Sequence, residues 1–243
     1  MKKLNYKRHK YGELNCVTAD LGNEPRNLAV FCHGYGAPGT DLVGLAEDLF
    51  SEMTPEMQSS WRMVFPEAPL SLAAQGIPGG RAWWVINMEK LLQLAASGQW
   101  DLVRDVEPPG IDSARKLLVA TIEAARAELP ADSKLIVAGF SQGAMLAMDV
   151  SVRGLDRSPD GLILFSGTLI CESVWRDAAT SRLSGVPVIQ SHGTLDPVLP
   201  FMAAEWLRQL LISAGAKLEF LPFPGPHTIS GEAIAASGRL LSS

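Results

Sequence analysis

Six short apolar runs, separated by amphipathic stretches, constrain the fold of this chain more than any other feature of its sequence. The runs cover residues 27–32, 62–65, 134–140, 161–165, 186–191 and 217–223. This alternation is typical of a mostly parallel sheet with helices on both faces. Residues 135–140 are apolar throughout, as expected of a central strand that is buried on both faces. We therefore predict an α/β fold.

Helix patterns lie between these runs. The pattern over residues 112–129 repeats apolar side chains at helical spacing, and Pro130 ends it. A second helix is predicted to begin with Pro200 at its first helical position and to end before Gly215. Because α/β chains of 243 residues commonly form one domain, we expect a single domain over residues 1–243.

The segment of about residues 66–110 differs from the rest of the chain. Several prolines and glycines frame a short helix pattern there. Its apolar positions are Met88, Leu91, Leu92, Ala95 and Ala96. We interpret the segment as an insertion that forms a small cap beside the sheet.

Charge and cysteine content exclude several classes of protein. The formal net charge is −5, whereas binding to a phosphate backbone needs clustered cations, so we expect no nucleic-acid partner. The basic cluster comprises Lys2, Lys3, Lys7, Arg8 and Lys10. We interpret this cluster as a solvated amino-terminal edge. The three cysteines lack CxxC spacing and indicate neither a zinc site nor a disulfide framework.

Hydropathy gives no sign of a membrane protein. No stretch of 18 apolar residues occurs, and no apolar signal-peptide region follows the basic start. We expect no stable membrane insertion and a cytoplasmic location.

The motif Gly139-Phe140-Ser141-Gln142-Gly143 stands where an apolar run gives way to a helix pattern over residues 144–152. A serine at so sharp a strand-to-helix turn adopts strained backbone angles, and glycines on either side let neighbouring chain pass closely. Its hydroxyl is thereby exposed at the carboxyl end of the sheet. Five-residue GxSxG matches also occur by chance, so the flanking strand and helix make this one informative. We predict that Ser141 is a nucleophile.

A serine hydroxyl needs a general base within hydrogen-bond reach. The chain has four histidines. We favour His227, because it lies in an irregular loop after the last apolar run, where its side chain can reach across the carboxyl ends of the strands. We expect His9 on the surface. His33 and His192 each end a strand in a His-Gly pair, and we expect both to bond loop backbone.

The orienting acid of such a site lies between the serine and the histidine in the chain. Asp196 follows the apolar run at residues 186–191, so its carboxylate is predicted at the same edge of the sheet. Asp160, Asp177 and Glu205 lie in positions where we expect solvated charges. The alternative for Asp196 is a turn-forming role, since Asp-Pro pairs favour turns.

The loop at residues 33–39 is glycine-rich and follows the first apolar run. Serine hydrolases of this kind stabilise the oxyanion with one backbone N–H from such a loop and one from the residue after the nucleophile. We assign the amides of Tyr35 and Gln142 to this oxyanion hole.

The same loop also matches GxGxxG, a pattern of dinucleotide-binding folds, at Gly34, Gly36 and Gly39. A dinucleotide site would need a helix that opens within the glycines and an acidic residue about 20 residues further on. Pro38 interrupts the loop, and Glu67 lies later than that spacing. We therefore favour the hydrolase interpretation.

Six motifs together carry a family resemblance. They are His33-Gly34-Tyr35-Gly36, Pro66-Glu67-Ala68-Pro69, Trp83-Trp84, Gly139-Phe140-Ser141-Gln142-Gly143, His192-Gly193-Thr194-Leu195-Asp196-Pro197-Val198 and Gly225-Pro226-His227. From about residue 28 to the carboxyl terminus, the chain resembles the phospholipase/carboxylesterase family of α/β-hydrolases, which includes bacterial carboxylesterases and acyl-protein thioesterases. The resemblance implies an α/β-hydrolase fold, with Ser141 as nucleophile, Asp196 as acid and His227 as base.

The expected reaction is hydrolysis of a small carboxylic ester through an acyl-enzyme on Ser141, with thioesters and lysophospholipids also open. No cofactor or metal is expected, because serine, imidazole and backbone amides supply the chemistry. Candidate pocket residues are Leu70, Leu72, Trp83 and Trp84, and core packing is the alternative for the leucines. The segment at residues 84–110 is longer than expected for the thioesterases, so the acyl-chain preference stays open. A peptidase or amidase and a catalytically silent binding protein are the alternative functions.

Overall fold

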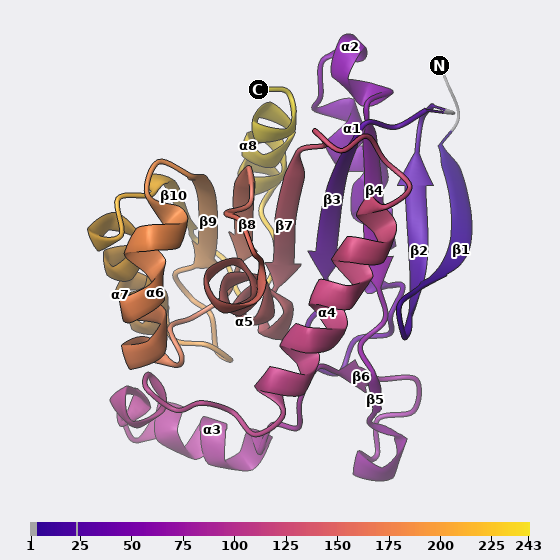
Figure 1. Ribbon diagram of the computed structural model, residues 1–243. Coiled ribbons are helices and arrows are strands. Elements are labelled where there is room, and N and C mark those ends of the chain that lie inside the picture. The colour runs from indigo at the N-terminus through magenta and orange to yellow at the C-terminus, as the bar shows by residue number, and fades with distance from the viewer. Residues whose placement is uncertain (1–3, 23) are drawn as a thin grey trace.

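The computed structural model describes residues 4–22 and 24–243, and its centre is an eight-stranded sheet (Figure 1). The strands, in spatial order, are β1 (Asn5–Tyr11), β2 (Leu14–Asp20), β4 (Trp61–Pro66), β3 (Asn27–Cys32), β7 (Leu135–Phe140), β8 (Gly161–Phe165), β9 (Pro187–Gly193) and β10 (Lys217–Phe223). Neighbours from β4 to β10 are parallel, whereas β2 is antiparallel to both β1 and β4. The predicted α/β fold with a mostly parallel sheet is confirmed.

All six predicted strands are present, but the β1–β2 hairpin was not predicted. Its first strand is an edge strand with many charged residues, so it lacks the apolar run that reveals the buried strands. Lys7, Arg8 and Lys10 are exposed on it, which agrees with the expected solvated edge. Lys2 and Lys3 lie outside the described residues.

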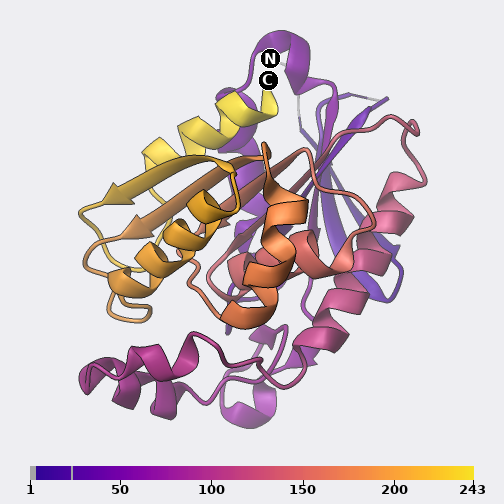
Figure 2. The ribbon, with the colours of Figure 1, turned by 60° about the vertical axis from the view of Figure 1, so that its left-hand side comes forward.

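The helices form one layer on each face of the sheet (Figures 1 and 2). One layer comprises α4 (Ile111–Arg126), α5 (Gln142–Asp149), α6 (Glu172–Leu183) and α7 (Phe201–Ser213), and the other comprises α1 (Leu45–Ser51) and α8 (Gly231–Leu241). Successive residues of β7 alternate between the layers, with Val137 packing on the first and Ile136 on the second. The predicted helix start at Pro200 is one residue early, because Pro200 has an extended backbone and is the N-cap of α7.

The segment at residues 66–110 lies across the end of the molecule toward which β3 and β7 point (Figure 1). It contains the short strands β5 (Leu70–Ser71) and β6 (Arg81–Ala82), α3 (Met88–Ala96), and 3-10 turns at Ala73–Gln75 and Trp100–Val103. The side chains of Met88, Leu92 and Ala95 are outside those that the structure describes. A further 3-10 turn (Asp41–Gly44), α2 (Pro55–Gln58) and a π-helical turn (Val150–Gly154) complete the elements. Within the described residues, no helix is both long and apolar enough to span a membrane.

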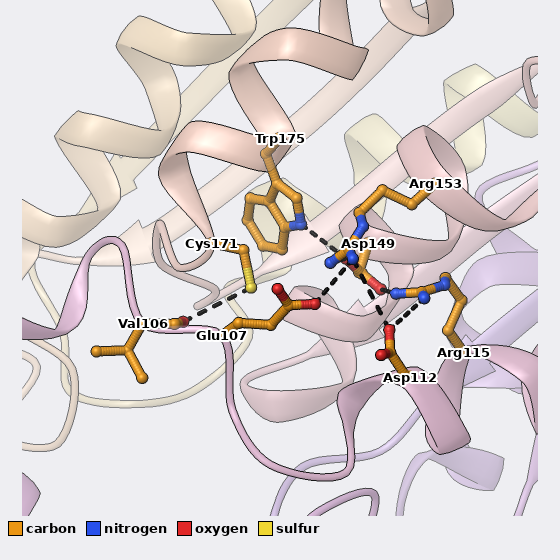
Figure 3. A network of polar contacts seen from close by, with 8 residues as sticks. All are labelled: Val106, Glu107, Asp112, Arg115, Asp149, Arg153, Cys171 and Trp175. Carbon is orange, nitrogen blue, oxygen red and sulfur yellow. Dashed lines mark hydrogen bonds and ion pairs between the residues drawn. The ribbon is translucent and has the colours of Figure 1, made fainter.

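A buried carboxylate holds the carboxyl end of α5 (Figure 3). Asp149 is fully buried and accepts hydrogen bonds from Arg115 Nη1 at 2.8 Å, Arg153 Nη1 at 3.2 Å and Trp175 Nε1 at 2.8 Å. A buried charge is tolerated where such partners surround it, and removing one partner from a buried ion pair typically costs about 3–5 kcal/mol. These contacts join α4, the π-helical turn and α6 to the carboxyl end of α5, the helix whose N-cap is Ser141.

Candidate active site

Ser141 lies at the turn between β7 and α5 and has backbone angles that are unusual for a residue with a side chain. Its φ is 56° and its ψ is −120°. The turn is tight because Gly139 and Gly143 are in close contact, and a Cβ on Gly139 would lie 2.2 Å from the carbonyl oxygen of Gly143. A Cβ on Gly143 would lie 2.0 Å from the carbonyl oxygen of Cys32, at the end of β3. The glycines of the motif are therefore required by close backbone packing, and the strained serine stands at the amino end of a helix.

Asp196 and His227 meet at the same end of the sheet. His227 Nδ1 lies 2.6 Å from Asp196 Oδ2, and the ring of His227 is 4.8 Å from that of Phe140, the residue before Ser141. Ser141 and His227 line the same cavity. In the part of the chain that the structure describes, the Ser141 hydroxyl makes no hydrogen bond to the imidazole, and such contacts often tighten only when substrate binds.

The two oxygens of Asp196 have different partners. Oδ1 accepts hydrogen bonds from the amides of Val198 at 2.8 Å and Leu199 at 2.9 Å, which makes a local turn. Oδ2 faces His227 and also lies 3.3 Å from Nε2 of His192. The carboxylate is thus both the turn residue considered above and the partner of His227. Burial raises its pKa, but the hydrogen bonds from His192, His227 and Leu199 outweigh burial and hold the pKa well below the usual range.

The other histidines have the backbone partners that were expected for them. His192 Nε2 donates to the carbonyl of Leu199 at 2.9 Å, and its contact with Asp196 was not predicted. His33 Nδ1 donates to the carbonyl of Gly34 at 2.8 Å, and its Nε2 accepts from the amide of Ala68 at 3.1 Å. Burial lowers the pKa of His33, in keeping with this neutral tautomer. His9, expected on the surface, is half-buried and stacks on Tyr11.

The loop after β3 lies directly over Ser141. A Cβ on Gly34 would be 3.3 Å from the Cβ of Ser141 and 3.2 Å from the ring of Phe140. Within the described residues, the amides of Tyr35 and Gln142 donate no hydrogen bond to the protein, whereas the amide of Ser141 donates to Phe165 at 2.8 Å. Two free N–H groups, one of them at a helix amino terminus, are an arrangement that can bind an anionic oxygen.

The side chain of Gln142 connects the predicted motifs, which sequence reasoning did not detect. Its Oε1 accepts from the amide of Trp83 at 3.0 Å, and its Nε2 donates to the carbonyl of Trp84 at 2.8 Å. The indole of Trp83 in turn donates to the carbonyl of His33 at 2.9 Å. One buried network therefore positions the serine turn, the tryptophan pair and the loop at residues 33–36.

A largely apolar cavity of about 930 Å³ opens beside Ser141 and His227. Its lining residues include Leu70, Trp84, Leu91, Leu94, Trp100, Val103, Val106, Met145, Thr168, Ile170 and Val198. Leu70 and Trp84 were predicted pocket residues and line the cavity. The predictions for Leu72 and Trp83 were wrong, because both side chains are fully buried in the protein and do not line the cavity.

The cap that forms one wall of this cavity is fastened at its far end to the start of α6. Arg104 Nη2 donates to Glu172 at 2.6 Å, and Asp105 accepts from the amide and hydroxyl of Ser173, each at 2.6 Å. Glu107 accepts from Arg153 at 2.8 Å, so this end also joins the buried network around Asp149 (Figure 3). The other end of the cap, at Trp83 and Trp84, is bonded to Gln142. The cavity wall is therefore anchored at both ends.

The sheet order, with a strained serine after its central strand and a histidine–carboxylate pair at the same edge, defines an α/β-hydrolase. The model of the phospholipase/carboxylesterase family matches residues 15–241, and the chain belongs to this family. This membership supports hydrolysis of esters or thioesters.

Individual proteins show the same likeness. Acyl-protein thioesterase 1 of Eremothecium gossypii is 30% identical over 178 residues, which are 72% of this chain and 68% of that protein. A probable carboxylesterase of Oryza sativa subsp. japonica is 28% identical over 84% of this chain and 82% of its own length. Among solved structures, esterase PE8 has a TM-score of 0.71 and 26% identity, with 98% of each chain covered.

Proposed function

We propose that this protein is a serine hydrolase that cleaves carboxylic esters or thioesters through an acyl-enzyme on Ser141. The observation that carries the proposal is the 2.6 Å contact between His227 Nδ1 and Asp196, beside the cavity that Ser141 also lines. In this contact Nδ1 carries the hydrogen and donates a hydrogen bond to the carboxylate. Nε2 is therefore unprotonated and can act as a base.

In the proposed reaction, Ser141 Oγ attacks the acyl carbonyl while His227 Nε2 takes the hydroxyl proton. The amides of Tyr35 and Gln142 stabilise the negative oxygen of the tetrahedral intermediate. His227 then returns the proton to the leaving alcohol or thiol, and the acyl group remains on Ser141. A water molecule attacks this acyl-enzyme with the same base and releases the acid.

The cavity supports an acyl group as the bound part of the substrate. Its apolar walls bury hydrocarbon, and its volume of about 930 Å³ lies at the upper end of the range for small-molecule sites. The names of the relatives, carboxylesterase and acyl-protein thioesterase, agree with an ester or thioester of such an acyl group.

The function is tested by assaying one preparation against p-nitrophenyl esters of increasing acyl length, acyl thioesters, a lysophospholipid and the matching p-nitroanilides. Hydrolysis of esters or thioesters but not of anilides is expected, because an amide requires protonation of a poorer leaving group. Turnover of anilides at comparable rates would favour the amidase alternative. Absence of both turnover and fluorophosphonate labelling would favour a silent binding protein.

Replacing Asp196 with asparagine should lower kcat by at least about a hundredfold. Asparagine can keep the turn, because its carbonyl oxygen can accept from the amides of Val198 and Leu199 as Oδ1 does. Its amide group cannot accept the proton of His227 Nδ1, so the base adopts the wrong tautomer. Steady-state kinetics with a p-nitrophenyl ester measure the loss.

Thermal stability as a function of pH is the control for this variant. The lowered pKa of Asp196 means that its charged form stabilises the wild type above the unfolded-state value of about 3.9, and that this contribution is lost as the pH falls below it. The difference in Tm between wild type and D196N should therefore shrink in acid. A kcat per folded molecule that stays nearly unchanged in D196N, at any Tm, would assign Asp196 to the turn alone.

A further inference from the structure

The helix of the cap, α3, turns one face toward the cavity. Asn87, which directly precedes the helix, lines the cavity together with Lys90, Leu91 and Leu94 of the helix itself. These three positions are three, four and seven residues after Asn87, a spacing that places side chains on one face of a helix. The two leucines match the apolar character of the cavity, and Lys90 is the exception among them.

A charge on this face is unusual, because the charged residues of an amphipathic helix normally lie on the opposite face. The other polar residues of α3 follow that rule. Glu89 and Gln93 are exposed and do not line the cavity, and Gln93 Nε2 donates to Glu89 Oε1 at 3.4 Å. Helix stability does not account for Lys90 either, since a cation in the first turn opposes the helix dipole.

No acidic side chain offsets this cation in the part of the cavity wall that the structure describes. Among the described residues, neither an aspartate nor a glutamate lines the cavity, and Lys90 forms no salt bridge. The carboxylate of Asp196 has no exposed surface and faces two histidines. The accessible charge of this apolar cavity is therefore positive.

The Lys90 side chain can be reached by a bound molecule. It is exposed where it lines the cavity, whereas Leu94, one helical turn further on, is buried in the wall. A lysine ammonium at such a position keeps much of its water, so it can pair with an anion without the desolvation cost of a buried ion pair. A chain that lies along α3 thus meets an apolar wall and, at the exposed mouth, a cation.

We propose that the acyl group cleaved by this protein carries a carboxylate at its far end, and that Lys90 binds this carboxylate. The inference rests on the proposed function and names its substrate class, a monoester or monothioester of a dicarboxylic acid. The anion is placed on the acyl group because Lys90 shares its helix face with Leu91 and Leu94, which line the cavity assigned above to that group. The methylene chain packs on the apolar wall, and the carboxylate stays at the mouth. Hydrolysis at Ser141 releases the dicarboxylic acid and the alcohol or thiol.

The test uses p-nitrophenyl monoesters of dicarboxylic acids of increasing length, each too long for its carboxylate to attack its own ester. Every monoester is paired with the neutral compound in which a carboxamide of the same shape replaces the carboxylate. For each length, kcat/KM of the carboxylate is divided by that of the carboxamide, so that effects of the chain and of the leaving group cancel. We expect this ratio to be about two- to fivefold lower in Lys90→Met than in wild type at one or more lengths, as for an exposed ion pair.

Two further variants and the salt concentration make the result specific to the charge of Lys90. Lys90→Arg keeps the cation and should keep most of the ratio. Lys116→Met removes an exposed lysine of α4 that does not line the cavity, so it should leave the ratio unchanged. Added salt should lower the ratio in wild type and leave it nearly constant in Lys90→Met, because salt screens an exposed ion pair.

Equal ratios in wild type and Lys90→Met at every length would overturn the inference, and they would show that the ammonium stays in water. Ser141-dependent hydrolysis of the carboxamides would then still support the proposed function. A fall of the same size in Lys116→Met would also overturn the inference, because it would reflect net charge alone.

A lysophospholipid supplies an anion from the other side of the scissile bond. If Lys90→Met lost activity toward it while the monoester ratios stayed equal, Lys90 would bind a phosphate of the leaving group, and the inference would be wrong. If wild type hydrolysed none of the esters and Ser141 took no fluorophosphonate, the proposed function would fail, and the inference with it.

Discussion

Replacing Ser141 with alanine is expected to lower kcat for p-nitrophenyl esters by at least about ten-thousandfold, because removing the nucleophile of such a site leaves only binding and oxyanion stabilisation. The Ser141 side chain stands at the cavity and belongs to neither hydrophobic core cluster, so the variant should fold as the wild type does. Initial rates at saturating substrate, together with circular dichroism, measure both properties.

A matched serine variant makes this result specific. Ser237 is buried in α8, on the other face of the sheet, and its hydroxyl donates to the carbonyl of Ala233 at 2.7 Å. Ser237→Ala should therefore change stability without a comparable loss of kcat. Mass spectrometry after fluorophosphonate treatment should place the adduct on the peptide that contains Ser141. An adduct on another serine would show that the nucleophile lies elsewhere.

Replacing His227 with alanine is expected to remove most of kcat, approaching the loss in Ser141→Ala, since without a base the serine hydroxyl is a poor nucleophile. His192→Ala is the matched control, because both rings lie near the same oxygen of Asp196. His192 is fully buried and bonded to Leu199, so its removal should act chiefly through stability and loop geometry. Its loss of kcat per folded molecule should be much smaller.

The double variant Ser141→Ala/His227→Ala tests whether the two residues act together. Members of one catalytic unit show non-additive losses, so the double variant should be little worse than either single variant. Rates are measured per folded molecule, with the folded fraction taken from thermal denaturation. Nearly additive losses, or equal kinetic damage from His192→Ala, would contradict the assignment of His227 as the base.

The sequence revealed those parts of the fold that depend on local burial. Strands β3, β7 and β8 are buried on both faces, so their residues are continuously apolar and their ends could be placed closely. The edge strand β1 is mostly exposed, and its charged residues do not form such a run. The hairpin that it makes with β2 was therefore not predicted.

Some features of the candidate site could likewise be predicted from the sequence, and others could not. Ser141, Asp196 and His227 each follow a predicted strand, and the carboxyl ends of parallel strands share one edge, so their proximity could be inferred from chain order. The contact between His192 and Asp196 and the hydrogen bonds from Gln142 to the tryptophan pair could not be inferred in this way. They depend on side-chain directions that chain order does not contain.

By itself, the sequence determined the class of fold, the family resemblance and three candidate residues for the chemistry, because strand burial and the serine turn are local properties of the chain. Only the tertiary structure decided which side chains face the cavity. Leu70 and Leu72 are two residues apart, as are positions on one face of a strand, yet Leu70 lines the cavity and Leu72 is in the core. The physical reason is that β5 ends at Ser71, so Leu72 no longer follows the alternation of a strand, and the direction of its side chain depends on the turn that follows.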